Sequence, residues 1–285
     1  MPTLLSCTDG SLYAPSIYDH SAWAARRMGA SVRVLHLLDP HPITPVTADF
    51  SGAIGLDAQA ALTAELVALE AAKNRVAQAR AQAIVADARA HFARAGLTAV
   101  TAEALHGTLA ESIGELEATA DLVVLGKRGE HADFAKGHLG SNLERVVRTC
   151  RRPVLVASRA FQPIERFLLA YDGSPSAKKA VAYAATHPLL RGLDCHLLAV
   201  GAANSTLAAD LAGARDQLFA AGYVVQADLV AGGNVEDLIA AAVKKEKTNL
   251  LVMGAYGHSR IRHLILGSTT TTMIRTVPIP VLLFR

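Results

Sequence analysis

The stretch of sequence that decides the fold lies near the C-terminus: Asn249-Leu-Leu-Val-Met-Gly254-Ala-Tyr-Gly257, then nine residues, then Gly267-Ser268-Thr269. The apolar run before Gly254 predicts a buried strand, and Ser268 predicts the start of a helix. A glycine-rich loop between a strand and a helix exposes backbone amides at the positive end of the helix dipole. The stretch therefore indicates an α/β unit with a loop suited to phosphate.

The same pattern occurs a second time, earlier in the chain. An apolar strand ends at Gly126, Gly129 follows, and after ten further residues come Gly140 and Ser141. The spacing is one residue longer than in the C-terminal copy. Two copies of this size predict two globular units rather than a solenoid array.

The repeat extends over almost the whole chain, because each copy also begins with an apolar strand that ends in Asp-Gly-Ser. Asp9 and Asp172 are 163 residues apart, whereas the first loop glycines are 128 apart, so the first copy carries about 35 extra residues. We expect a first domain at 1–160, which contains this inserted segment, and a second domain at 164–285.

The second half predicts strictly alternating strands and helices, which favour a parallel, doubly wound sheet. Ser174 and Asn234 are expected to cap two of its helices. We expect two tandem five-stranded sheets of order 3-2-1-4-5, related by a pseudo-twofold axis. Their short last strands, 154–157 and 281–284, are expected to pair, because an exposed apolar edge favours pairing.

The insertion in the first half predicts one long helix over about Asp57–Ala95, which follows a Pro-, Thr- and Gly-rich segment. At about 1.5 Å per residue this helix reaches roughly 55–60 Å, longer than one small domain needs. We expect it to contribute to a homodimer; the alternative is a helix that packs on its own sheet with a solvated end. Its expected apolar stripe consists of Leu62, Leu66, Leu69, Val76 and Phe92.

Topology brings an aspartate and a glycine loop together in each half. Ligands of doubly wound sheets bind beyond the carboxyl ends of the strands, where the strand order reverses, and strands one and four are neighbours there. Asp172 is thereby expected beside the loop of Gly254, and Asp9 beside the loop of Gly126. Such loops also occur as plain tight turns, with aspartates as turn residues and serines as N-caps, so both interpretations stay open.

These residues resemble the universal stress protein family, whose ATP-binding members carry Gly-x2-Gly-x9-Gly-Ser/Thr after strand four and an Asp after strand one. The resemblance covers both halves. It implies a cytoplasmic, stress-associated protein that binds ATP, or AMP or ADP, with Mg²⁺ held through the phosphates. It assigns the aspartate to the nucleoside, the strand-two backbone to adenine and the loop to the phosphates. The residues so assigned are Asp172, Val200, Gly254, Gly257, Gly267, Ser268 and Thr269 in the second half, and Asp9, Gly126, Gly129, Gly140 and Ser141 in the first.

The sequence departs from the family pattern in two places. The first loop is one residue longer, and Lys127 and Arg128 offer positive charge there in partial compensation. In the second half Tyr171 stands where the first half has the smaller Thr8, and we expect it to narrow the nucleoside pocket.

Two other classes of function remain open, a slow ATPase or nucleotidyl-transfer enzyme and an interaction scaffold that binds no nucleotide. The sequence contains neither Gly-x4-Gly-Lys-Ser/Thr nor an early Gly-x-Gly-x2-Gly, the patterns of the P-loop and of dinucleotide-binding folds. Because no convergent acid–base pair stands out, we expect at most weak ATPase activity.

Composition argues against several further classes of function. The net charge of +3, with both signs interspersed, is not typical of a nucleic-acid footprint, and no apolar run is long enough to span a bilayer. Three widely spaced cysteines predict reduced, buried thiols rather than disulfides. Four histidines flank the loops, and we do not expect them to form a metal site; they are His131, His138, His258 and His263.

Overall fold

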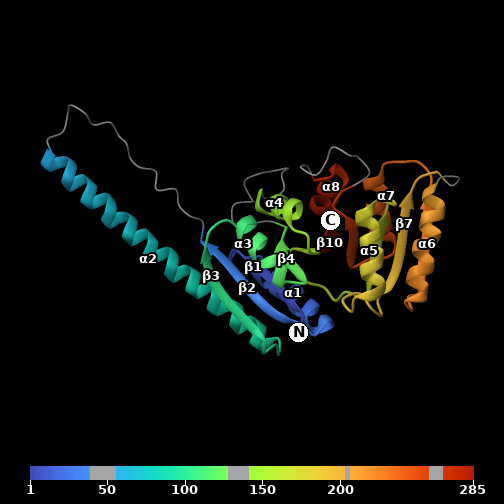
Figure 1. The fold of residues 1–285 in the computed structure, drawn as a ribbon, viewed down its shortest axis with the longest axis horizontal. Coiled ribbons are helices and arrows are strands. Elements are labelled where there is room, and N and C mark those ends of the chain that lie inside the picture. The colour runs from blue at the N-terminus through green and yellow to red at the C-terminus, as the bar shows by residue number, and fades with distance from the viewer. Residues whose placement is uncertain (39–55, 128–140, 203–205, 257–265) are drawn as a thin grey trace.

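The computed structural model describes residues 1–38, 56–127, 141–202, 206–256 and 266–285 (Figure 1). Strands and helices alternate through both halves. The first half contains β1 (Thr3–Thr8), α1 (Ala14–Met28), β2 (Ser31–Leu38), α2 (Leu56–Arg94), β3 (Val100–His106), α3 (Leu109–Leu116), a 3-10 turn (Glu117–Thr119), β4 (Leu122–Gly126), α4 (Ser141–Thr149) and β5 (Val154–Ala157). The second contains β6 (Arg166–Tyr171), α5 (Pro175–Thr186), β7 (Asp194–Val200), α6 (Thr206–Ala220), β8 (Val225–Val230), α7 (Val235–Lys245), β9 (Leu250–Gly254), α8 (Ser268–Thr276) and β10 (Val281–Phe284).

The ten strands form one sheet in the order β3-β2-β1-β4-β5-β10-β9-β6-β7-β8. Neighbours within each half are parallel, which confirms the α/β doubly wound class. The expected pairing of the two last strands is also confirmed, because β5 and β10 pair antiparallel. This pairing joins the two five-stranded sheets into one continuous sheet.

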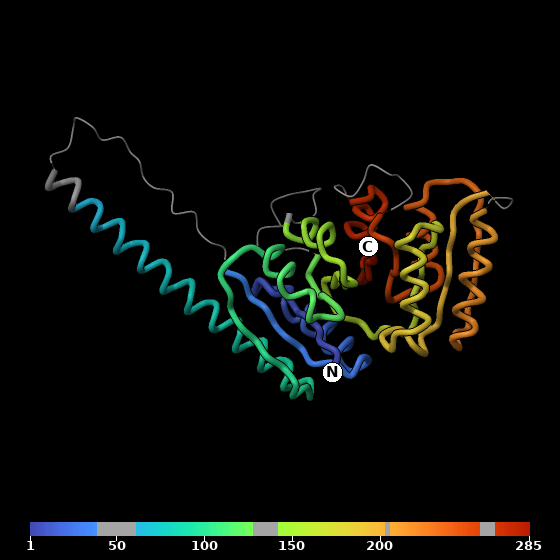
Figure 2. The backbone as a smooth tube through the Cα atoms, in the orientation of Figure 1, coloured from blue at the N-terminus to red at the C-terminus, as the bar shows by residue number. Residues whose placement is uncertain are grey.

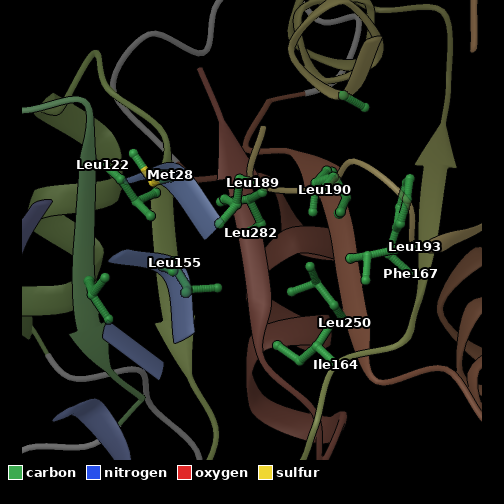
Figure 3. Close-up of a cluster of buried hydrophobic side chains, with 14 of the residues drawn as sticks. Met28, Leu122, Leu155, Ile164, Phe167, Leu189, Leu190, Leu193, Leu250 and Leu282 are labelled. Carbon is green, nitrogen blue, oxygen red and sulfur yellow. The ribbon is translucent and has the colours of Figure 1, made fainter. Parts of the chain in front are cut away.

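The seam between the halves is apolar and buried. Leu155 lies opposite Leu282, and neither side chain has any exposed surface. One of the two core clusters runs through the seam without a break, from Met28 and Leu122 in the first half to Phe167 in the second (Figure 3). The halves therefore share a core rather than touching at their surfaces.

Helices cover both faces of the sheet. One face packs against α1, α2, α5 and α6, and the other against α3, α4, α7 and α8. The expected caps are present in the second half. The Ser174 side chain accepts a hydrogen bond from the Ala177 amide at 3.2 Å, and that of Asn234 accepts one from the Asp237 amide at 3.0 Å.

Helix α2 is a single helix of 39 residues, as the sequence predicts, and its N-terminal part projects away from the body of the protein (Figure 2). Its C-terminal part packs on the sheet through Val85 and Phe92, which are buried. Phe92 was wrongly expected to share one stripe with the four upstream apolar residues. Those four lie on the projecting part and are exposed: Leu62, Leu66, Leu69 and Val76.

We predict that Leu282→Ala lowers the free energy of unfolding by about 2–5 kcal/mol, because it opens a cavity in a fully buried seam. Leu155→Ala should cost a similar amount, and the double variant should lose less than the two single losses combined, because both side chains line one space. Urea denaturation followed by circular dichroism measures all three. Val67→Ala on exposed α2 is the control, and we expect it to stay within about 0.5 kcal/mol of the parent. Additive losses at the seam would contradict the shared packing.

Candidate nucleotide site

The carboxyl ends of β6 and β9 lie side by side in the second half. Ala170 is aligned with Met253 across this parallel pair. Asp172 comes two residues after Ala170, and Gly254 directly follows Met253, so both leave the sheet at the same edge. The structure thus brings the predicted aspartate to the start of the predicted loop, at the point where the strand order reverses.

Asp172 forms a turn and remains accessible to solvent. One carboxylate oxygen accepts a hydrogen bond from the Ser174 amide at 3.0 Å, which is an Asx turn. Gly173 between them has φ of 76°, in the region that favours glycine. The residue as a whole is exposed. Asp172 therefore has a structural role in the turn, which leaves its side chain at the surface of the crevice.

Gly254 is required by the packing of the fold. A Cβ built on it would collide with the Ser176 hydroxyl and lie only 3.0 Å from the Ser176 Cβ. Ser176 is fixed there, because its hydroxyl donates a hydrogen bond to the Tyr256 carbonyl at 2.8 Å. The first turn of α5 thus approaches the end of β9 closely, and this approach accounts for the first glycine of the motif.

Gly267 has no such explanation. Its φ of −58° is open to any residue. A Cβ there would lie 3.4 Å from the Thr270 hydroxyl and 3.5 Å from the Ala255 carbonyl oxygen, which are ordinary contacts. Among the described residues, nothing near Gly267 requires a glycine at this position.

Helix α8 begins at this glycine without a side-chain cap. Its first amides and its dipole therefore point toward the crevice with no side-chain acceptor from the N-cap. The Thr269 hydroxyl, which the sequence assigned to phosphate, instead donates to the Glu236 carboxylate at 2.7 Å. Only the backbone amide of Thr269 is then left to donate to a phosphate. No sequence motif pointed to Glu236 as a site residue, although the sequence predicts its place in the first turn of α7.

The corresponding crevice of the first half is partly covered. The Ile84 side chain of α2 packs against Gly10, where an added Cβ would lie 2.6 Å from Ile84 Cγ1. One Asp9 oxygen accepts from the Ser11 amide at 2.9 Å, and the other is buried with no hydrogen-bond partner among the described residues. The inserted helix therefore covers the aspartate turn in the first half, whereas Asp172 in the second half is exposed.

The ammonium group of Lys127 is bound by the other half of the chain, contrary to the expectation that it supplements the first phosphate loop. Its ammonium group donates to the Val277 and Ile279 carbonyls of the other half, at 2.6 and 2.7 Å. These carbonyls lie at the C-terminal end of α8, where a cation is favourable. Burial lowers the pKa of Lys127 to about 8. Sequence spacing gave no sign of a contact 150 residues away.

The Tyr171 side chain is buried in the same core cluster as Leu211 of α6. Burial raises the pKa of its hydroxyl, and the nearby charges of Asp210 and Asp172 raise it further. The expected narrowing of the nucleoside pocket stays a prediction. Val200 lies at the end of β7, opposite Val230 of β8, and it is the last strand residue before the crevice.

Several predicted site residues lie outside the described residues or at their margin. Gly126 ends β4 and Ser141 begins α4. Outside the description are Gly129, Gly140, Gly257, Arg128 and the four loop histidines. Within the described ranges, no cluster of His, Cys, Asp or Glu has the geometry of a metal site, and no helix has both the length and the apolarity to cross a membrane.

A groove of about 390 Å³ lies elsewhere, between α2 and the ends of β2 and β3. Arg75, Gln82 and His106 are among the residues that line it, and none of the predicted site residues does. We assign the candidate site to the ends of β6 and β9 nonetheless, because the aspartate and the first glycine of the motif meet there, where the strand order reverses.

Comparison with known proteins gives a consistent result. The chain matches the universal stress protein family twice, over residues 1–158 and 163–285. It is 38% identical over 288 residues to universal stress protein Slr1230 of Synechocystis sp., with all of both chains covered. A universal stress protein from Archaeoglobus fulgidus has a similar solved structure, with a TM-score of 0.73 and 21% identity over 99% of this chain and 98% of that one. A functionally unknown protein from Pseudomonas aeruginosa gives a TM-score of 0.56 at 14% identity, over 100% of this chain and 92% of that one.

We predict that replacing Lys127 changes how stability depends on pH. Because the folded-state pKa is lowered from 10.5 to about 8, the unfolded chain binds more protons between these values. Stability from this group therefore rises with pH across that window. From pH 7 to pH 10, the free energy of unfolding of the parent should increase by roughly 1–3 kcal/mol relative to that of Lys127→Met. Urea titrations at both pH values measure it. The exposed Lys245→Met is the control, and a Lys127→Met difference that does not change with pH would contradict the buried ammonium group.

Proposed function

Because the chain belongs to the universal stress protein family, and because its second half keeps the loop motif in full, we propose that this half binds an adenine nucleotide. The proposed ligand is ATP, with Mg²⁺ held through its phosphates, and its use is regulatory or structural in a cytoplasmic, stress-associated protein. The observation that carries the proposal is Gly267. The fold explains the glycine at 254 but not the one at 267, whereas a phosphate that contacts the backbone at the start of α8 would require it.

The difference between the two crevices supports the second half as the binding half. Asp172 is exposed at the end of β6, whereas Ile84 of α2 packs on the turn that contains Asp9. A nucleoside that enters the first crevice would have to displace this part of α2. In the second half α6 stands between the corresponding strands, and it has 15 residues where α2 has 39, since the insertion occurs only in the first copy.

The proposed roles follow from position. The Asp172 carboxylate contacts the nucleoside hydroxyls, as in the family pattern, and the backbone near Val200 contacts adenine. The amides of Gly267, Ser268 and Thr269 hold the phosphates at the N-terminus of α8. Because Glu236 accepts from the Thr269 hydroxyl, a carboxylate lies beside the phosphate end of the site. A free triphosphate would meet repulsion there, so we expect the bound form to carry Mg²⁺ between carboxylate and phosphate.

Mass spectrometry of ligand released from the denatured, purified protein tests the proposal directly. Bound ATP supports it. Accumulation of ADP or AMP from added ATP supports the alternative of a slow ATPase or nucleotidyl-transfer enzyme. An empty protein that also fails to bind added ATP supports the alternative of an interaction scaffold.

We predict that Gly267→Val weakens ATP binding by about tenfold or more, a loss of at least ~1.4 kcal/mol. A Cβ at this position makes ordinary contacts with the described residues, and about 1 kcal/mol is lost at the N-cap, but the valine side chain occupies the space of the phosphate. Calorimetric titration with MgATP measures the affinity, and circular dichroism verifies the fold. Gly213→Val is the matched control, because Gly213 lies on exposed α6 with nothing near a built Cβ. Unchanged affinity in Gly267→Val would place the nucleotide elsewhere.

Gly254→Ala separates packing from binding at the same loop. Its Cβ collides with Ser176, so we expect a loss of stability of about 1–3 kcal/mol from overpacking. Gly257→Asp, outside the described residues, is expected to weaken binding through repulsion of phosphate. If Gly254→Ala left stability unchanged, the packing explanation for this glycine would be wrong.

A further inference from the structure

The projecting part of α2 carries an apolar stripe that this chain does not cover. Leu62, Leu69 and Val76 recur every seven residues and therefore lie along one line of the helix, and Leu66 lies one turn from both leucines. Their exposed fractions are 38%, 51%, 70% and, for Leu66, 36%. Exposed leucines and valines in one row mark a contact surface more often than isolated ones do.

The charges beside the stripe are separated along the helix. Residues 61–72 contain two acidic residues, Glu65 and Glu70, and no basic one. Residues 73–80 contain three basic residues and no acidic one. They are Lys73, Arg75 and Arg80. The projecting helix thus has a negative half and a positive half, joined near Ala72.

We propose that a second copy of this chain packs on the stripe, with the two α2 helices antiparallel. Antiparallel pairing places the negative half of each helix against the positive half of the other, whereas parallel pairing places like charges together. The charge pattern thus makes the helix complementary to itself in one direction only. A partner of another kind would not require this symmetry.

The register follows from the same residues. A twofold axis near Ala71 sets Leu66 opposite Val76 of the second copy. The same axis sets Leu62 opposite the other copy's Arg80 and Leu69 opposite its Lys73, so that the methylene stems of the two basic residues cover the leucines. Glu65 and Glu70 then lie within one helical turn of these two positive charges. Glu70 and Lys73 already pair within one chain at 3.1 Å, with both side chains about half exposed. Such an exposed pair is weak by itself and is free to exchange partners across the axis.

The seam between the two halves offers no alternative contact for a second copy. The last strands of the two halves, β5 and β10, are already paired within the chain and offer no edge to a second copy. The contact through α2 leaves the crevice at Asp172 untouched, so it does not rest on nucleotide binding. A test of assembly is therefore independent of the test of ATP binding.

Light scattering during size-exclusion chromatography of the full-length protein tests the proposal. We expect twice the chain mass of 29.9 kDa. The E65K/E70K variant makes both halves of the helix positive, so its dissociation constant should rise by about tenfold or more. The variant K73E/R80E makes both halves negative and should dissociate in the same way. An equal mixture of the two variants should restore the dimer, because each now complements the other. The variant E115K/D216K, with the same charge change at exposed sites remote from α2, should behave as the parent.

Single cysteines determine the direction of the helices. Ala72→Cys lies within a turn of the axis and should form a disulfide between two copies under mild oxidation. Ala79→Cys, one heptad away, should not, because its counterpart is about 20 Å distant along an antiparallel pair. The three native cysteines are buried and do not compete. A parent protein that stays monomeric up to about 1 mM would overturn the proposal. So would a dimer that neither charge variant weakens, or one that links through Ala79→Cys.

Discussion

The antiparallel pairing of β5 with β10 is the contact on which the rest of this structure depends. Each strand is only four residues long and fully apolar, and alone it would be an exposed edge of a small sheet. Paired, the two strands turn two five-stranded units into one sheet and let one core cluster extend across both. The energetic gain is large because the joined residues lose nearly all their exposed surface, and because three residues of each strand gain a partner across the seam.

The pairing also connects the two candidate loops. Lys127, next to the first loop, donates to carbonyls at the C-terminal end of α8. From the other side, the Tyr256 hydroxyl donates to the Arg148 carbonyl at the C-terminal end of α4, at 3.1 Å. Each loop thus holds the far end of the helix that begins at the other loop. The two contacts correspond in place but use different chemistry, because the buried ammonium group carries a charge and the phenol does not.

The sequence predicted the fold well because the signals were local and repeated. Alternating apolar strands and capped helices need only nearest neighbours in the chain, and the repeat doubled each signal. The site was predicted less completely because its details depend on contacts between distant residues. No spacing rule indicates that Thr269 bonds to Glu236, or that Ile84 packs on Gly10. Lys127 between two glycines resembled a phosphate ligand, and only the folded seam shows that it contacts the other half.

The insertion in the first half accounts for the asymmetry between two otherwise similar units. Its C-terminal part is anchored by Phe92, Val85 and Ala88, which are buried on the sheet, and each large apolar side chain so buried contributes about 1.5–3 kcal/mol. The projecting part lacks this support. Its exposed apolar row therefore gains most from a partner. The same helix that covers the turn at Asp9 thus carries the surface on which a second chain fits. Because the insertion covers the corresponding turn only in the first half, a ligand has free access at the exposed turn of Asp172.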